Sequence, residues 1–290
     1  MARPPSNDAT RKATTPVWVT RLDGGTPPIT TMSRRPDAVV TEEPLQILAG
    51  GPGQESQPVT ITMRTPGHDF ELAVGFLWSE GVLSSPDDVY EVRYCEVPPD
   101  EPQLYNVVSV RARRPLEVAP RTTVTTAACG ICGITSLEAL KKVCAPLAAG
   151  PTIGAELLLS LPDRLRQAQR AFDTTGGLHA AGLFTADGTL VNAREDVGRH
   201  NAVDKVVGRA VLDGRVPLSE HVLCVSGRAS FEIIQKAAAA GIAVIVAVSA
   251  PSSLAVQAAQ ALGMTLVGFV REGSGNIYAH ADRVAVLPTT

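Results

Sequence analysis

Hydrophobic and polar positions along the first half of the chain predict β-strands around a single helix. Runs rich in β-branched and aromatic residues, each bounded by Pro, Gly or Asp, predict strands at 16–22, 58–64, 88–95 and 103–113. Between these runs, apolar residues at 70, 73, 74, 77 and 78 follow a helical period that ends near Gly81. We therefore expect a β-rich layer with one packed helix.

The pattern changes after Pro162. A helix is predicted at 162–172, with proline near its start, and a hairpin at 177–196 that turns at 186–188. The remainder alternates, with helices predicted at 199–211, 229–240 and 251–262 and strands at 222–226, 242–248 and 264–270. The middle strands are apolar throughout, which indicates burial on both faces in a largely parallel sheet. The expected fold class is α/β, with a β-rich N-terminal α+β domain followed by an α/β domain.

The same patterns divide the chain into four segments. We expect a flexible tail at 1–20, the β-rich domain at 21–125, a connector with a CxxC loop and a helix at 126–161, and the α/β domain at 162–290. The first residues lack the apolar centre of a secretory signal, so we interpret them as a solvated tail.

The amino-acid composition argues against several classes of function. The chain has 290 residues, 44% of them hydrophobic and 19% charged, with a net charge of -3. These values are typical of a globular protein and argue against a bulk electrostatic nucleic-acid binder. No apolar run reaches the length needed to span a bilayer, so we expect no membrane segment. Five cysteines, an odd number, favour a reducing cytoplasm over a disulfide scaffold.

Three loops are predicted to meet at one edge of the parallel sheet. "VSGRAS" (225–230) and "VSAPSS" (248–253) each follow an apolar strand and open a helix, and "NAREDVGRH" (192–200) joins them. Open α/β sheets bind ligands at this edge. Ser226, Gly227 and Arg228 would suit a phosphate at a helix N-terminus, whereas the alternative is plain capping by Ser226 and Ser249.

Two further stretches are candidates for the same edge. In "REDVGRHNAVDK" (194–205), Arg194, Arg199 and His200 stand beside acids, which favours a polar ligand over a solvated helix start. "FVREGSGNIY" (269–278) places Arg271 and a Gly-Ser-Gly turn after the last parallel strand, although a plain hairpin would explain the glycines. His179, among small residues, fits a core position and a ligand site equally well.

The thiol pair Cys129 and Cys132 in "CGICG" leaves several chemistries open: zinc, a disulfide, redox exchange and sulfur carriage. A zinc site would need two further ligands, and the chain has no second CxxC or paired His. The zinc deaminase signature is missing too, and a thioredoxin-like pair would cap a helix directly within a βαβ unit. We therefore expect no metal at this site. The glycines around the two thiols favour a mobile thiol pair that moves to its partners or is approached by them.

The strings "CGICG", "GGLHAAGLF", "REDVGRHNAVDKVVG", "SGRASFEIIQKAA" and "SAPSSLAV", in this order, resemble the FdhD family of formate dehydrogenase accessory sulfurtransferases over roughly residues 40 to 287. The resemblance implies a carrier that takes persulfide sulfur from a cysteine desulfurase. It would pass the sulfur to the molybdenum of bis(molybdopterin guanine dinucleotide), before this cofactor enters formate dehydrogenase. It also implies a zinc-free, cytidine-deaminase-like three-layer C-terminal domain, a cytoplasmic site and a homodimer.

The resemblance also assigns residues. Cys129 would carry the persulfide, assisted by Cys132, and 269–274 would contact the cofactor. The family usually has a second basic residue in that stretch, where this chain has Glu272 and Ser274. The full set of expected cofactor-binding residues is Arg194, His200, Ser226, Gly227, Arg228, Phe269, Val270, Arg271, Glu272, Gly273 and Ser274. The alternative function is a non-catalytic chaperone that binds and delivers the cofactor without carrying sulfur.

Overall fold

The structure is a computed structural model that describes residues 12–24, 30–117, 124–125, 144, 146–147 and 150–286. The thiols of Cys129 and Cys132, and the start of the predicted connector, lie outside these ranges. Within them, no helix has both the length and the apolar character needed to cross a bilayer.

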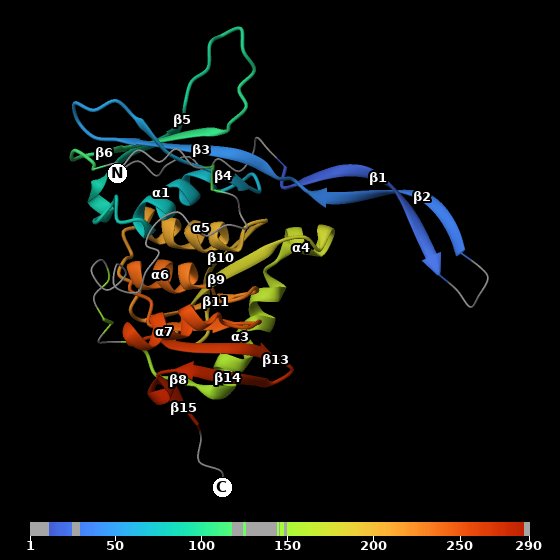
Figure 1. Cartoon of the computed structure of the whole chain (residues 1–290), viewed down its shortest axis with the longest axis vertical. Helices are drawn as coiled ribbons and strands as arrows, with labels where there is room; N and C mark the ends of the chain where they lie inside the picture. The colour runs from blue at the N-terminus through green and yellow to red at the C-terminus, as the bar shows by residue number, and fades with distance from the viewer. Residues whose placement is uncertain are drawn as a thin grey trace.

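A five-stranded sheet forms the upper layer of the body in Figure 1. Its strand order is β5-β6-β3-β4-β7. The strands are β3 (Glu43–Gly50), β4 (Gln57–Arg64), β5 (Val89–Tyr94), β6 (Val107–Ala112) and β7 (Val124–Thr125). The expected β-rich first half is confirmed, and β3 is a strand that the sequence pattern did not predict.

A six-stranded sheet forms the second layer, in the order β10-β9-β11-β12-β13-β14. Neighbours pair in parallel from β11 to β13, and the remaining pairings are antiparallel. The α/β class and the predicted hairpin are therefore confirmed. The strands are β9 (His179–Thr185), β10 (Leu190–Asp196), β11 (His221–Val225), β12 (Val244–Ala247), β13 (Thr265–Arg271) and β14 (Ser274–Ala279).

Helices cover both faces of this sheet (Figure 1). One face carries α5 (Arg199–Leu212), α6 (Phe231–Ala239) and α7 (Ser253–Ala261). The other carries α3 (Ala155–Gln167), which is followed by the short α4 (Arg170–Thr175). The predicted start of the helix at 162 is wrong. Pro162 lies inside α3, because Leu158, Leu161 and Leu165 bury an apolar stripe that outweighs the lost proline hydrogen bond.

The two sheets share one hydrophobic cluster, which α1 (Asp69–Ser79) and α5 complete between them. These helices cross at glycines. A Cβ atom on Gly208 would lie 1.8 Å from the Glu71 carbonyl oxygen, and one on Gly75 would lie 1.9 Å from the Asp204 carbonyl oxygen. Only glycine allows so close an approach of the two backbones. The close crossing of α1 and α5 therefore joins the β-rich layer to the α/β layer.

An antiparallel ribbon of β1 (Thr14–Gly24) and β2 (Thr30–Val40) projects from the body (Figure 1). The strand β1 begins inside the stretch 1–20 that we expected to be a tail, so that expectation is wrong for residues 14–20. A separate, short two-stranded sheet pairs β8 (Ile153–Gly154) in parallel with β15 (Val284–Ala285) near the C-terminus.

Candidate functional site

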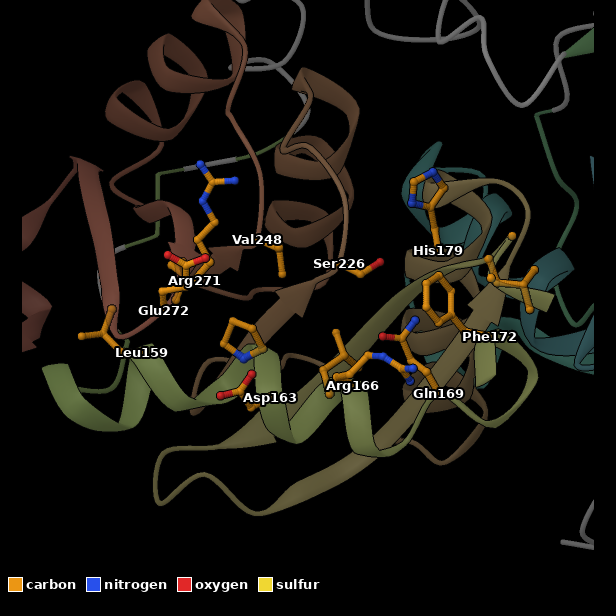
Figure 2. A pocket seen from close by; sticks show the side chains of 16 residues that line it. Leu159, Asp163, Arg166, Gln169, Phe172, His179, Ser226, Val248, Arg271 and Glu272 are labelled. Carbon is orange, nitrogen blue, oxygen red and sulfur yellow. The ribbon is translucent and has the colours of Figure 1, made fainter. Parts of the chain in front are cut away.

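A cavity of about 730 Å³ opens at the carboxyl ends of β11, β12 and β13, on the α3 side of the sheet (Figure 2). Each of these strands contributes to its wall, through Ser226, Val248 and the segment 270–272. The opposite wall comes from α3 and α4, and His179 at the start of β9 completes the lining. The cavity lies at the sheet edge where the strand order predicted a ligand.

The hairpin from β13 to β14 shapes one side of the cavity. Its turn is Glu272–Gly273, both with positive φ (53° and 71°), rather than the expected Gly-Ser-Gly, and Ser274 pairs with Arg271. Phe269 has a φ of 55°, at a register shift of β13. Such a conformation is costly for an aromatic residue and is common near functional sites. Beyond this irregular point, Val270, Arg271 and Glu272 line the cavity.

The loop after β11 packs closely against His179. The Ser226 hydroxyl accepts the backbone N–H of Ala180 at 2.8 Å and does not cap α6, whose N-cap is Ser230. A Cβ atom on Gly227 would lie 3.2 Å from His179 Nδ1, so a glycine here lets the imidazole sit against the backbone. The Ser230 hydroxyl lies 2.9 Å from His200 Nε2. The predicted loops at 192–200 and 225–230 do meet.

Positive charge gathers around His179, at the edge of the cavity that we call the rim; Arg199 and Arg228 act on His179 but do not themselves line the cavity. Burial lowers the pKa of His179, and the nearby Arg199, His200 and Arg228 lower it further. Burial and Arg228 also lower the pKa of Arg199, whose Nε is buried without a hydrogen-bond partner in the part of the chain that the structure describes. Glu232 Oε2 lies 2.9 Å from His200 Nε2, and its carboxylate places one negative charge near Arg199. The rim therefore favours an anion.

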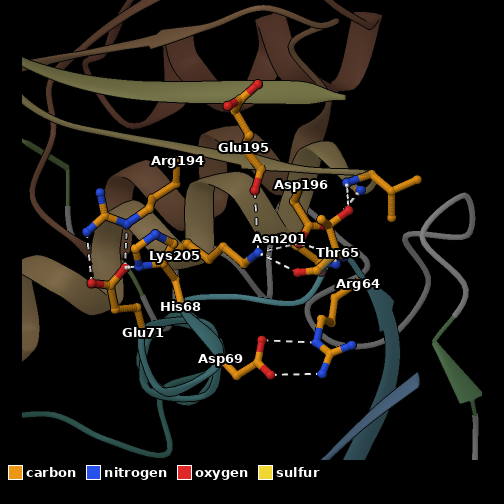
Figure 3. A network of polar contacts seen from close by, with 12 residues as sticks. Arg64, Thr65, His68, Asp69, Glu71, Arg194, Glu195, Asp196, Asn201 and Lys205 are labelled. Carbon is orange, nitrogen blue, oxygen red and sulfur yellow. Dashed lines mark hydrogen bonds and ion pairs between the residues drawn. The ribbon is translucent and has the colours of Figure 1, made fainter. Parts of the chain in front are cut away.

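Arg194 does not join this rim. Its Nη2 donates to Glu71 at 2.8 Å, and both side chains belong to the network in Figure 3. Arg194 lines a different cavity, of about 290 Å³. Burial alone would raise the pKa of Glu71, but the hydrogen bonds from Arg194 and His68 lower it to about 2. The expectation that Arg194 lies beside the other candidate ligand-binding residues is therefore wrong.

Most polar residues of "REDVGRHNAVDK" are engaged in internal contacts. Lys205 Nζ lies 2.7 Å from Asp196 Oδ2, and the Asn201 amide donates to Asp196 at 2.9 Å (Figure 3). Asp204 is paired with Lys236, whose Nζ lies 2.8 Å from both of its oxygens. All of these side chains are buried. The charges of these residues therefore find partners inside the protein, where they help to hold its elements together.

Sequence reasoning missed the wall formed by α3 and α4. Asp163, Arg166, Gln169 and Phe172 line the cavity, at spacings of three residues. Asp163 and Arg166 lie one turn apart on α3, whereas Gln169 and Phe172 belong to the start of α4, in a segment for which the sequence predicts only a helix. The signal that could have revealed this wall is the pair of charged residues, Asp163 and Arg166, on a helix that covers an apolar sheet.

The predicted cysteines cannot be placed, since Cys129 and Cys132 lie outside the described residues. Cys224 is fully buried in β11 and burial raises its pKa, as is typical of an inert thiol. Burial also raises the pKa of Cys144. Over the described ranges, no group of three or more His, Cys, Asp or Glu residues is arranged to hold a metal ion.

Comparisons with known proteins match this architecture. The sequence model of the FdhD/NarQ family matches residues 40–285. A Streptomyces coelicolor protein named sulfur carrier protein FdhD is 55% identical over 263 residues, which cover 88% of this chain and 92% of the relative. A Mycobacterium tuberculosis protein of the same name is 51% identical over 260 residues, covering 86% and 92%.

A solved structure agrees in fold. It comes from Desulfotalea psychrophila and is named for an accessory role to formate dehydrogenase. It superposes with a TM-score of 0.72, at 23% identity, over 94% of this chain and 100% of the solved one. At that identity, the likeness concerns the fold alone.

Proposed function

This chain belongs to the FdhD/NarQ family, and from that premise we propose that it is a sulfur carrier that serves the maturation of a formate dehydrogenase. Relatives with more than half of their aligned residues identical carry the name of sulfur carrier. The structural observation that carries the proposal is the cavity of about 730 Å³ with its cationic rim, at the ligand edge of the sheet.

In the proposed reaction, Cys129 receives sulfur from a cysteine desulfurase. The Cys129 thiolate attacks the terminal sulfur of the donor persulfide, the donor S–S bond breaks, and the donor cysteine leaves as a thiolate. Cys129 then holds the persulfide, and Cys132 assists its onward transfer. The acceptor is the molybdenum of bis(molybdopterin guanine dinucleotide), which is cargo and not a resident cofactor. This step precedes insertion of the cofactor into formate dehydrogenase.

The residues around the cavity fit one end of that cargo. A volume of about 730 Å³ suits a nucleotide-sized fragment rather than the whole molecule. Arg199 and Arg228 supply cations, and the N-terminus of α6 supplies backbone N–H groups, for a diphosphate. Glu272 stands on the wall where a second basic residue was expected, so the phosphates belong at the rim near His179.

We also propose that the protein acts as a homodimer in the cytoplasm. The dimer is tested by light scattering of the purified protein at several concentrations. A monomer at all of them would contradict it.

Restoration of formate dehydrogenase activity tests the carrier function. The assay uses cells that lack their own copy of this protein and express the parent or a Cys129→Ala/Cys132→Ala variant. We expect the parent to restore activity and the variant to fail, while the variant still binds GDP. Restored activity with the double variant would favour the alternative, a chaperone that delivers the cofactor without carrying sulfur.

A further inference from the structure

One side chain of the cavity wall has an unused hydrogen-bonding group. Gln169 is only 4% exposed, and its amide has no hydrogen-bond partner among the residues that the structure describes. Figure 2 shows the amide pointing toward the cavity beside the Phe172 ring. Because Gln169 lines the cavity and its amide is engaged by no protein group in the described part of the chain, the amide is available to hydrogen-bond a ligand there.

The local structure explains why this amide is free. Gln169 is the N-cap residue of α4, a position whose side chain normally accepts a hydrogen bond from the first turn. Here Glu195 of β10 takes that role, because its carboxylate accepts the N–H of Ala171 at 3.0 Å and of Phe172 at 2.8 Å. The Gln169 side chain makes no capping bond. Glu195 is therefore a positioning residue that leaves the amide available to the cavity.

Phe172 adds a flat surface next to this amide. The Arg166 guanidinium lies 4.7 Å from the centre of the Phe172 ring and is held by Asp173 at 2.6 Å. This arrangement fixes the ring within the wall. Aromatic rings in such positions stack on heterocycles.

We propose that Gln169 and Phe172 form a subsite for a flat heterocycle that carries a hydrogen-bond donor next to an acceptor. An amide offers one acceptor and a pair of donors side by side, and therefore matches such an edge with two hydrogen bonds. Guanine and pterin rings share this edge. The inference rests on the proposed function, in which the cargo contains both rings, and it adds where one of them sits.

Binding measurements on the full-length protein test this subsite. The probes are GDP, 6-hydroxymethylpterin, and pyrophosphate as a ligand without a ring. Gln169→Leu removes the amide at nearly constant size, and Gln167→Leu is the matched control, because Gln167 is exposed and does not line the cavity. Gln169→Glu keeps an acceptor but loses the donors, and serves if the leucine variant does not fold.

We expect Gln169→Leu to lower the affinity for the ring ligand that occupies the subsite by about tenfold or more, because two hydrogen bonds are lost. Pyrophosphate binding and the Gln167→Leu variant should be unchanged. Weaker GDP binding would assign the subsite to guanine, and weaker pterin binding would assign it to the pterin. Equal affinities of parent and variant for both rings would overturn the inference. A parent that binds neither ring would also overturn it, whereas sulfur loading of Cys129 would still support the carrier function.

Discussion

Glu71 is predicted to stabilise the contact between the two layers through its charge. The carboxylate of Glu71, on α1, binds Arg194 of β10, and its pKa is lowered from 4.5 to about 2 despite burial. Lowering a pKa from 4.5 to about 2 is worth about 3.5 kcal/mol, and this is the stability that the ionised carboxylate contributes at neutral pH. Glu71→Gln should lower the free energy of unfolding by about that amount, because Arg194 then loses its anionic partner.

The pH dependence of this loss is the sharper part of the prediction. A lowered pKa contributes stability that is fully present above pH 4.5 and is lost as the pH falls toward 2. The difference between parent and variant should therefore be about 1.4 kcal/mol smaller at pH 3.5 than at pH 7. Urea denaturation followed by circular dichroism at both pH values measures it.

The control for this experiment is Glu91→Gln. The Glu91 side chain is 49% exposed and lies 3.4 Å from Arg93, so its loss should change stability by less than about 0.5 kcal/mol at either pH. A Glu71→Gln cost that stays constant from pH 7 to pH 3.5 would refute the electrostatic reasoning. A cost no larger than that of the control would refute it as well.

Three further predictions concern the rim and the core. Arg228→Ala should weaken GDP binding about tenfold in calorimetry, since it removes a cation from the rim, and unchanged affinity would contradict the phosphate assignment. Gly208→Ala should cost more than about 3 kcal/mol in thermal unfolding, because its Cβ would lie 1.8 Å from a carbonyl oxygen, whereas Gly154→Ala, with open space around it, should cost little. Lys236→Met should cost about 3–5 kcal/mol, since Asp204 would be left buried and unpaired, and a double variant with Asp204→Leu should recover much of the loss.

The elements with a strong burial pattern were predictable from sequence. The strands β11, β12 and β13 lie between helices on both faces, so their central residues are continuously apolar, and α1 shows a helical period. The strand β2 was not predictable, because the ribbon has little core to impose alternation. The start of α3 was also missed, since a proline within a helix is normally read as its beginning.

The sequence could predict only those parts of the candidate site whose position follows from the order of the strands and helices along the chain. The ends of parallel strands meet at one edge, so the loops of Ser226 and Arg271 could be placed together in advance. Charge patterns do not reveal partners that are distant in sequence. Arg194 looked available for a ligand because Glu71 lies 123 residues away. Gln169 went unnoticed for the related reason that its capping role is taken by a residue of another element.

The central claim is that Cys129 carries sulfur, and peptide mass spectrometry tests it most directly. The parent, Cys129→Ala and Cys132→Ala proteins are each incubated with a cysteine desulfurase and cysteine, then digested without reductant. The account predicts one additional sulfur atom on the Cys129 peptide of the parent and of Cys132→Ala, and none on Cys129→Ala. If Cys129→Ala acquires sulfur as the parent does and still activates formate dehydrogenase, the claim is contradicted.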